Sequence, residues 1–353
     1  MKKEFLTGNE SIVRAALACG AQMMSGYPIT PTTEIIHYWA EAASKNASLK
    51  FLQTEDEMSA GFAQIGAVLA GTKAFTATAG PGNILMQDAF SMAENMRIPT
   101  VAFINQRGGP STGTVIYSQQ ELNLTCFGGN GEGLRIVYSA ATPQDLYDYA
   151  IKVFNTAWRY RFPTFMLADG YQAKTQAQIE TYELAEKQIE PVSAVPYLNI
   201  NGEPINLRNT YNLETEFNKI IESHHAAFEA AAPEIIEFDD YHTLDADLVI
   251  FAHGIVAAAG KAAVDALRKN GLKVGLFRPI TLNPYPKEAA LRIMPNKKAI
   301  LVAESSLGQF LNLTKANLYG QTVPIHTLLK PALGISVEEI YEKAEQILKE
   351  ING

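Results

Sequence analysis

The chain has 353 residues and a formal net charge of −8, with 47% hydrophobic and 19% charged residues. A chain of this length can form two domains, each with its own hydrophobic core. Lys and Arg are not clustered, which argues against nucleic acid as a partner, because neutralising phosphates requires a basic surface. The low charged fraction predicts that partner proteins cover part of the surface.

No apolar run reaches the roughly 18 residues that a membrane-spanning helix needs, and no apolar run follows the N-terminal Met1-Lys2-Lys3. We therefore expect no membrane span, no signal peptide and a cytoplasmic location. The two cysteines, Cys19 and Cys126, lie far apart and form no CxxC motif. This excludes a disulfide framework, a tetrathiolate zinc site and an iron–sulfur cluster held by this chain alone.

Extended and helical segments alternate along the first part of the chain, and Thr32 is expected to be the N-cap of a helix that runs to about residue 44. Strands separated by helices of this length predict a parallel sheet with right-handed crossovers. The predicted strands are 22–25, 49–53, 73–78, 99–105, 135–138 and 163–168, and the predicted helices include 9–18, 57–70, 83–95, 119–127 and 143–159.

A second alternation of strands and helices begins near residue 247 and ends in a helix for which Ser336 and Glu339 form a capping box. The intervening stretch is rich in Glu and Gln and contains a long helix, predicted at about 213–230. We therefore predict an α/β protein with two parallel-sheet domains, residues 1–170 and 242–353, joined by a linker at 171–241. No metal site is predicted, because His224 and His225 are adjacent on the long helix and face different directions. His253, in a strand-end turn, has no acidic or nucleophilic neighbour and is interpreted as structural.

Four strand-end loops are the candidates for a site, because ligands bind at the carboxyl ends of parallel strands. They are residues 27–31, 53–57, 78–82 and 106–114. In the first loop, Thr30 lies between two prolines that hold the backbone extended. In the third, Gly80-Pro81-Gly82 opens a helix whose free N–H groups can bind an anion or a polar ring edge. This loop lacks the motifs of a P-loop or a dinucleotide fold.

Glu57 and Arg107 are the two charged candidates in these loops. An acidic residue at a helix N-terminus usually complements the helix dipole. Glu57, however, precedes a helix rich in Ala and Gly that allows a backbone or a ligand to approach closely. A carboxyl group in such a crevice is partly desolvated and keeps its proton to higher pH. Arg107, followed by Gly108-Gly109, suits a carboxylate or phosphate clamp, with a surface ion pair as the alternative.

Together these loops resemble the alpha subunit of 2-oxoacid:ferredoxin oxidoreductases, thiamine-diphosphate enzymes that oxidatively decarboxylate 2-oxoacids and make acyl-CoA. The resemblance covers nearly the whole chain, is looser across the linker, and implies a pyrimidine-binding domain followed by a transketolase C-terminal-like domain. It is carried by GYPITP (26–31), QTEDE (53–57), TATAGPG (76–82) and RGGPSTG (107–113), and in the second domain by RP (278–279) and ESSLGQ (304–309).

The resemblance implies that Glu57 contacts the ring nitrogen of the aminopyrimidine. A proton shared there promotes the imino tautomer, which takes the proton from thiazolium C2. It also implies that Thr30 and Arg107 bind the substrate carboxylate beside C2. The other residues implied in cofactor binding are Tyr27, Pro28, Ile29, Gly80 and Gly82.

The resemblance further implies that this chain supplies half of an active site. A beta subunit would bind the diphosphate and Mg²⁺, in keeping with the lack of a Gly-Asp-Gly metal loop here. Iron–sulfur clusters would lie on partner subunits, with a gamma subunit, ferredoxin, CoA and a 2-oxoacid as further partners.

The substrate that the resemblance favours is 2-oxoglutarate, which would be converted to acyl-CoA and CO2, or formed in the reverse reaction. Ser111-Thr112 and residues 31–34 resemble that branch, whereas residues 113–120 also resemble branched-chain 2-oxoacid enzymes. No second basic residue near Arg107 is evident for a distal carboxylate, so pyruvate and branched-chain 2-oxoacids stay as alternatives. Two other functions also stay open: a non-catalytic assembly subunit and a non-redox thiamine enzyme related to transketolase or sulfopyruvate decarboxylase.

Overall fold

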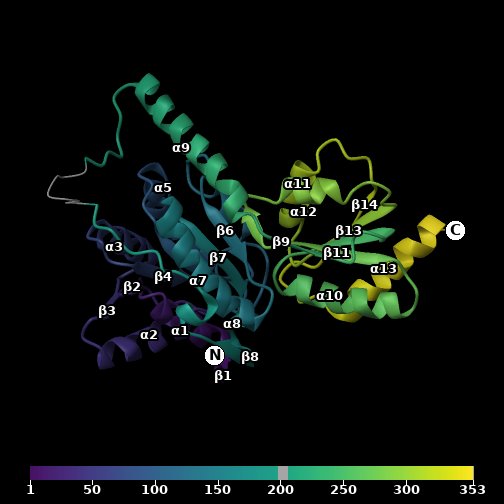
Figure 1. Ribbon diagram of the computed structural model, residues 1–353, viewed down its shortest axis with the longest axis horizontal. Coiled ribbons are helices and arrows are strands. Elements are labelled where there is room, and N and C mark those ends of the chain that lie inside the picture. Colours follow the sequence, from purple (N-terminus) through teal and green to yellow (C-terminus); the bar gives the residue numbers. More distant parts are fainter. Residues whose placement is uncertain (198–205, 353) are drawn as a thin grey trace.

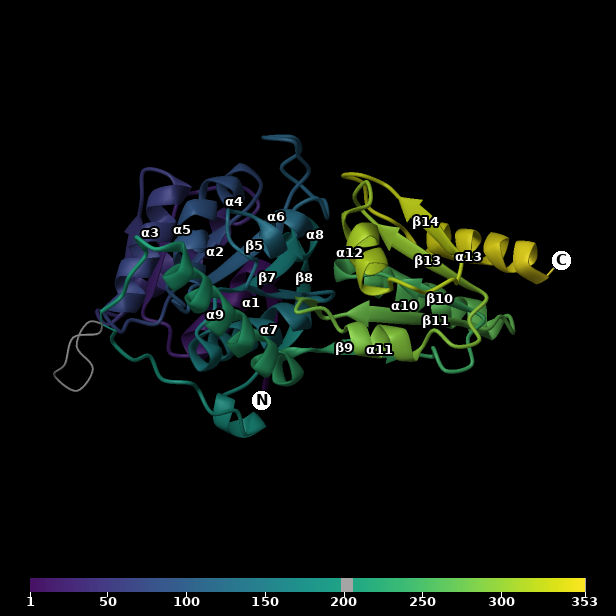
Figure 2. The ribbon, with the colours of Figure 1, turned by 90° about the horizontal axis from the view of Figure 1, so that it is seen from above.

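Two mostly parallel β-sheets, one in each of two lobes, organise the molecule (Figure 1). The computed structural model describes residues 1–197 and 206–352, so part of the predicted linker lies outside the described residues. Figure 2 shows the two lobes side by side, with the first in purple to teal and the second in green to yellow.

The first sheet has seven strands in the order β12-β6-β7-β5-β4-β2-β3, all parallel except β12. Every residue of β4, β5 and β7 is buried, as expected for central strands covered on both faces. The strands are β2 (Met23–Gly26), β3 (Lys50–Gln53), β4 (Ala74–Thr78), β5 (Val101–Gln106), β6 (Ile136–Ser139), β7 (Thr164–Asp169) and β12 (Thr281–Asn283).

Helices cover both faces of this sheet. On one face α1 (Gly8–Ala18), α2 (Thr33–Lys45) and α7 (Pro143–Tyr160) share a core with alternate strand residues such as Phe75 and Phe103. On the other face α3 (Glu57–Leu69) and α5 (Gln87–Asn95) pack on the intervening ones. This division follows from the two-residue alternation of side chains along a strand.

The second sheet has the order β14-β13-β10-β11-β9, with only β9 antiparallel. Helices α10 and α13 share the core on one face, and α11 and α12 flank the other. The elements are β9 (Phe238–Tyr241), β10 (Leu248–Phe251), α10 (Gly254–Lys269), β11 (Val274–Pro279), α11 (Lys287–Arg292), β13 (Ala299–Glu304), α12 (Gln309–Asn317), β14 (Ile325–Leu329) and α13 (Val337–Asn352).

Short elements complete the first lobe, and α9 (Glu214–Ile235) projects from it (Figure 1). Strand β1 (Lys2–Thr7) pairs with β8 (Gln176–Thr181) in a small antiparallel sheet. The remaining helices are α4 (Pro81–Leu85), α6 (Leu122–Phe127), α8 (Gly170–Lys174) and the 3-10 helix Leu184–Lys187. None of the helices in the described ranges combines the length and the apolar character needed to cross a bilayer.

The α/β class and the two mainly parallel sheets confirm the predicted fold, and the capping box is present. Ser336 N donates to Glu339 Oε2 at 2.9 Å and Glu339 N donates to Ser336 Oγ at 3.2 Å. Thr32 lies at the predicted N-cap position of α2, but its side chain does not cap the helix, and one predicted helix is interrupted. Thr32 precedes α2 in an α-helical rather than an extended conformation, so its hydroxyl donates to Ile29 O instead of capping the helix. The helix predicted over 83–95 is interrupted at Met86, between α4 and α5.

Each sheet gains one edge strand from outside its predicted domain, and the two lobes share a core. Strand β12, from the predicted second domain, pairs with β6, and β9, from the predicted linker, pairs with β11. An apolar cluster runs from Ile104 and Phe165 of the first sheet to Phe277 and Val302 of the second. We keep the division at residues 170 and 241 as a proposal, with these two strands crossing it.

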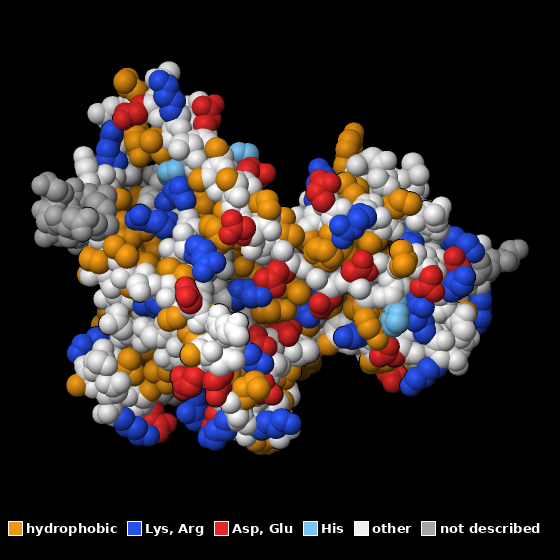
Figure 3. Space-filling view, in the orientation of Figure 1, with side chains coloured by type: hydrophobic (Ala, Val, Ile, Leu, Met, Phe, Trp, Pro, Cys, Tyr) orange, Lys and Arg blue, Asp and Glu red, His pale blue; other side chains and the backbone are white. Residues whose placement is uncertain are grey.

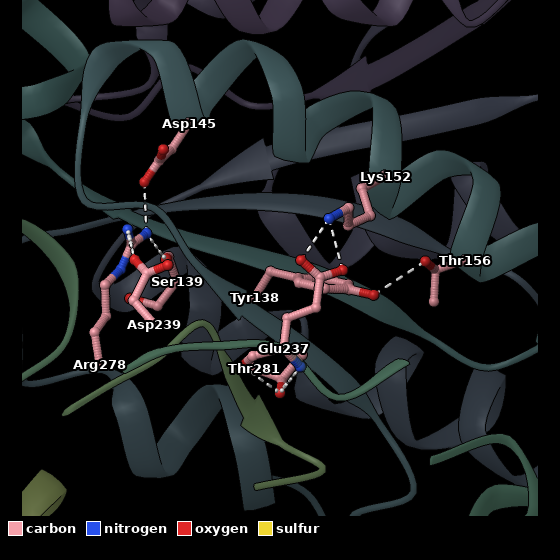
Figure 4. Close-up of polar contacts among 9 residues, drawn as sticks. All are labelled: Tyr138, Ser139, Asp145, Lys152, Thr156, Glu237, Asp239, Arg278 and Thr281. Atoms are coloured by element: carbon pink, nitrogen blue, oxygen red, sulfur yellow. Dashed lines mark hydrogen bonds and ion pairs between the residues drawn. The ribbon is translucent and has the colours of Figure 1, made fainter. Parts of the chain in front are cut away.

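Polar contacts also join the lobes (Figure 4). Arg278 of β11 is ion-paired with Asp145 at 2.5 Å and with Asp239 at 3.0 Å, and it donates to Ser139 O. Near them, Lys152 of α7 pairs with Glu237, which precedes β9. Away from this joint, charged side chains of both signs are interspersed over both lobes on the face shown in Figure 3.

Candidate active site

Three strand-end loops of the first sheet converge on one place. They follow the neighbouring parallel strands β2, β4 and β5, and the N-terminus of α3 adjoins them. Gly26 O accepts hydrogen bonds from the N and Oγ1 of Thr54, and Thr54 Oγ1 also donates to Asp56 O at 2.8 Å. These bonds fix the loop after β2 against the residues that lead into α3.

Asp56 and Glu57 stand side by side but have different surroundings. Asp56 is the N-cap of α3, and its carboxylate accepts from Ser59 N at 2.7 Å. Because Asp56 fills the capping role, the carboxyl group of Glu57 remains available. Only 5% of Glu57 is exposed, and no other residue of the described chain makes a side-chain hydrogen bond to it. Burial is the main cause that raises the pKa of Glu57, so it holds a proton to higher pH.

The Gly80-Pro81-Gly82 turn lies against Glu57 and Arg107. A Cβ atom on Gly82 would come within 2.6 Å of Glu57 Cγ and 2.1 Å of Thr78 Oγ1. On Gly80, whose φ is +50°, it would lie 2.8 Å from Arg107 Nε. Only glycine therefore allows the turn to approach both charged side chains so closely.

Arg107 reaches back to the loop after β2. Its Nη1 donates to Thr30 O at 2.9 Å, and only 6% of the residue is exposed. Arg107 Nε is buried without a partner, as is the hydroxyl of Thr78. The guanidinium group therefore retains hydrogen-bonding capacity beside Thr30.

The structure thus brings together most of the predicted site residues. Arg107 contacts Thr30 and adjoins Gly80, and Glu57 adjoins Gly82. Tyr27, Pro28 and Ile29 belong to the loop that carries Thr30, and 37% of Tyr27 is exposed. Ile29 contributes to this loop through its carbonyl oxygen, which accepts from Thr32 N.

Sequence reasoning missed Glu121, which is buried behind the turn. Its Oε1 accepts from Gly80 N at 2.8 Å and from Arg107 N at 3.0 Å, and its Oε2 accepts from Asn83 Nδ2 at 3.0 Å. The one signal in the sequence is a lone acidic residue before the short apolar segment of α6. Such a residue is typical of a helix cap, and that reading would not have led to the site.

The second lobe supports the loop that follows Arg107. Gln119 is bonded through its side chain to Ser305 N at 2.9 Å and to His253 O at 2.9 Å. His253 is fully buried with Nδ1 3.0 Å from Ser139 Oγ, and burial lowers its pKa to about 3. The imidazole is therefore neutral at physiological pH and holds a structural place between the lobes. No group of three or more His, Cys, Asp or Glu residues in the described ranges is placed to hold a metal ion.

Comparisons with known proteins give matches over both lobes. The family model "pyruvate flavodoxin/ferredoxin oxidoreductase, thiamine diP-bdg" matches residues 14–240, and "pyruvate:ferredoxin oxidoreductase core domain II" matches residues 246–338. The 2-oxoglutarate synthase subunit KorA of Methanocaldococcus jannaschii is 32% identical, covering 88% of this chain and 90% of the relative. The ketoisovalerate oxidoreductase subunit VorB of Methanothermobacter marburgensis is also 32% identical, covering 88% of both chains.

Two solved structures share the fold. A 2-oxoglutarate:ferredoxin oxidoreductase from Magnetococcus marinus, described with 2-oxoglutarate, coenzyme A and succinyl-CoA bound, superposes with a TM-score of 0.87 and 23% identity. It covers 98% of this chain, which spans 65% of that longer one. A split-gene transketolase, described as an inactive beta4 tetramer, superposes with a TM-score of 0.58 and 12% identity over 97% of each chain.

These matches show the class of the protein: the chain belongs to the family of thiamine-diphosphate-binding pyruvate flavodoxin/ferredoxin oxidoreductases. Within that class its relatives are KorA and VorB subunits, and it is a subunit of a 2-oxoacid:ferredoxin oxidoreductase that resembles the 2-oxoglutarate synthase alpha subunit. The relatives carry the names of two different substrates, so family membership leaves the choice of 2-oxoacid open.

Proposed function

We propose that this chain supplies the pyrimidine-binding half of a thiamine-diphosphate site that oxidatively decarboxylates a 2-oxoacid to acyl-CoA and CO2, with ferredoxin as electron acceptor, or runs the reverse reaction. The observation that carries the proposal is the position of Glu57. It is a buried carboxyl group with a raised pKa and no competing side-chain bond, and it lies beside a glycine turn that also adjoins Arg107.

The residues at this place suit the aminopyrimidine of thiamine diphosphate. The two glycines leave the turn without side chains next to Glu57 and Arg107. The buried hydroxyl of Thr78 has no protein partner and lies within this group. When bound, the cofactor supplies a nucleophilic carbon and an electron sink for decarboxylation.

Glu57 acts on the cofactor by holding a proton at its carboxyl oxygen. Burial favours the neutral carboxyl group, which can donate to a ring nitrogen at a pH where an exposed glutamate would be ionised. The helix dipole at the start of α3 favours the ionised form, so the two effects oppose each other and bring the two protonation states closer in free energy. Such a balance suits a group that both gives and takes a proton in each turnover.

Thr30 and Arg107 orient the substrate. The guanidinium group, with Nη1 fixed on Thr30 O, is suited to hold a carboxylate through its remaining donors. Fixing this carboxylate keeps the bond that breaks in one orientation and replaces water around it with protein dipoles. We expect the Thr30 hydroxyl, on the same loop, to contribute a further polar contact to this carboxylate.

A partner chain would complete the site. We propose that a beta subunit binds the diphosphate and Mg²⁺ and that iron–sulfur clusters lie on partner subunits. Large apolar side chains support this, because they are exposed in and beside the site loops, where a protein interface would cover them. They are Tyr27 (37% exposed), Met58 (39%), Ile84 (54%) and Leu85 (41%).

For the substrate we favour 2-oxoglutarate, because several relatives are 2-oxoglutarate synthase subunits. A branched-chain 2-oxoacid is the second candidate, favoured by the equally similar VorB subunit and by two exposed apolar residues, Val115 and Ile116, in the loop after Arg107.

The test is to purify the assembled complex through a tag on this chain without oxygen and to measure reduction of ferredoxin with a panel of 2-oxoacids. We expect CoA-dependent reduction, highest with 2-oxoglutarate, and no activity from this chain alone. Activity of the lone chain would contradict the half-site proposal. A complex that reduces ferredoxin with none of the 2-oxoacids would contradict the proposed function.

A further inference from the structure

Glu121 joins the two strand ends that carry the proposed site. It lies just before α6, yet its carboxylate reaches the turn after β4 and the end of β5. One oxygen, Oε1, accepts both backbone N–H groups, from Gly80 at 2.8 Å and from Arg107 at 3.0 Å. The other oxygen accepts from Asn83 Nδ2 at 3.0 Å, in the first helical turn after Gly80.

The surroundings of Glu121 hold this carboxylate in one position. The residue is 4% exposed, its own N–H donates to Gln106 Oε1 at 3.3 Å, and its C=O accepts from Thr125 Oγ1 at 2.8 Å. Burial raises the pKa of Glu121, and the bonds from Asn83, Arg107 and Gly80 oppose that shift. A buried carboxylate with three donors is a fixed acceptor rather than a mobile surface charge.

The turn at Gly80 and the end of β5 at Arg107 flank the place where substrate and cofactor meet in the proposed function. Gly80 packs against the Arg107 side chain, and Gly82, two residues on, packs against Glu57. The distance between the proposed substrate clamp and the proposed cofactor acid therefore depends on how the turn sits against the end of β5. Between the turn and Arg107 N, the shared acceptor is Glu121 Oε1.

We propose that Glu121 is a positioning residue. By accepting from Gly80 N and Arg107 N with one oxygen, it fixes Arg107, the proposed substrate-binding residue, relative to the glycine turn that lies against Glu57. The catalytic consequence rests on the proposed function. The tie, meaning the two hydrogen bonds from Gly80 N and Arg107 N to Glu121 Oε1, does not depend on it. An acceptor oxygen, rather than negative charge, is what the geometry requires of this side chain.

The test compares side chains of similar size that keep or remove the acceptor, in the assembled complex. Glu121→Met leaves both N–H groups without an acceptor, and we expect KM for the 2-oxoacid to rise at least about tenfold, because an unpaired buried donor is costly. Glu121→Gln retains one carbonyl oxygen for the two N–H groups and should recover most of that loss. Equal KM values for the Met variant and the wild type would overturn the proposal.

A matched control separates positioning from general stability. Glu304 is also buried, and it accepts two backbone N–H groups, from Phe310 at 2.9 Å and Leu311 at 2.8 Å, at the start of α12 in the second lobe. Glu304→Met should lower the melting temperature as Glu121→Met does, while KM stays near the wild-type value. A similar KM rise in both variants would mean that Glu121 is merely structural.

A double-mutant cycle tests whether Glu121 acts through Arg107. Since Arg107→Lys already replaces the guanidinium group by a single ammonium group, adding Glu121→Met should raise KM less on that background than on the wild type. Strictly additive effects would contradict the coupling.

Hydrogen exchange supplies a readout that needs no activity. Peptides that contain the amides of Gly80 and Arg107 should exchange faster in Glu121→Met than in Glu304→Met, and unchanged exchange would refute the tie itself. An inactive wild-type complex would instead point to failure of the proposed function. If the Met variant does not accumulate, Glu121→Asp carries the same measurements, because its side chain is one methylene too short to reach both N–H groups.

Discussion

At the scale of single residues, three carboxyl groups near one loop cluster show how surroundings assign different roles. Asp56 is a helix cap whose pKa is lowered by its bonds to Ser59. Glu57 is buried with a raised pKa and has no other residue as a bonding partner in the described chain. Glu121 is buried but fully engaged with three donors. Of these three, Glu57 alone combines burial with a carboxyl group that no other residue of the described chain engages, which suits general acid–base chemistry.

Replacing Glu57 by Gln should lower kcat of the complex by about two to four powers of ten, because an amide cannot transfer the proton. The wild-type pH profile should lose activity as pH rises through the raised pKa of Glu57, and the Gln variant should lack that limb. Steady-state kinetics at several pH values measures both effects. Glu55→Gln is the matched control, since Glu55 is exposed and its loss should leave kcat nearly unchanged. A Glu57→Gln variant with wild-type kcat would favour a non-catalytic assembly role.

Asp169 should give stability a pH dependence of known sign. It is fully buried at the N-terminus of α8, and burial raises its pKa from 3.8 to about 7. The folded state then favours the protonated form, so its stabilising contribution is complete below about pH 4 and is lost as pH rises through about 7. Asp169→Asn keeps an oxygen for the N–H groups of Tyr171 and Gln172 and removes this dependence.

We expect the difference in the free energy of unfolding between Asp169→Asn and the wild type to change by roughly 1–4 kcal/mol from pH 4 to pH 8. Denaturant unfolding of the purified chain at each pH measures it. Asp56→Asn serves as a control of opposite sign, because the pKa of Asp56 is lowered and its contribution is lost only as pH falls. Parallel pH curves for the wild type and Asp169→Asn would contradict the assignment.

At the scale of elements, the sequence predicted what local patterns encode. The alternation of strands and helices, the two sheets and the start of α3 at Glu57 follow from periodicity and from the acidic residues before an apolar helix. The tie at Glu121 was not predictable, since its partners Gly80 and Arg107 lie 41 and 14 residues away in the chain. No local pattern identifies which buried carboxylate will bridge two strand ends.

Helix α3 was expected to approach its neighbours closely, and its glycines differ in this respect. A Cβ atom on Gly61 would lie 2.7 Å from Ala89 Cβ of α5, whereas on Gly66 it would meet nothing within 4 Å. We therefore expect Gly61→Ala to destabilise the chain by roughly 1–3 kcal/mol through overpacking. Gly66→Ala should stabilise it by about 0.5–1 kcal/mol through helix propensity. Denaturant unfolding of both variants measures this contrast, and equal effects at the two positions would refute it.

At the scale of the whole molecule, two strands could not be predicted from the sequence because they are short and pair with distant parts of the chain. Strands β9 and β12 have 4 and 3 residues, too few to show a period, and each adds an antiparallel edge to a parallel sheet. Together with the shared apolar cluster they join the two lobes. This matters for the site, because the loop after Arg107 is supported from the second lobe through Gln119.

Arg278 is the polar centre of the joint between the lobes (Figure 4), and its removal should lower the stability of both together. The side chain is 9% exposed and pairs with Asp145 from the first lobe and Asp239 from β9. Arg278→Ala leaves the Asp145 carboxylate, which is 17% exposed, without its cation, and we expect a loss of roughly 1–3 kcal/mol in the free energy of unfolding.

The shared apolar core should nevertheless keep the unfolding of Arg278→Ala in a single transition, which differential scanning calorimetry measures. Lys45→Ala is the control, because Lys45 is 70% exposed and its ion pair with Glu41 lies on the surface of α2, where water screens the charges. Its melting temperature should stay close to that of the wild type. Two resolved transitions in Arg278→Ala would mean that the ion pairs, rather than the apolar core, couple the lobes, and an unchanged melting temperature would mean that they contribute little to the joint.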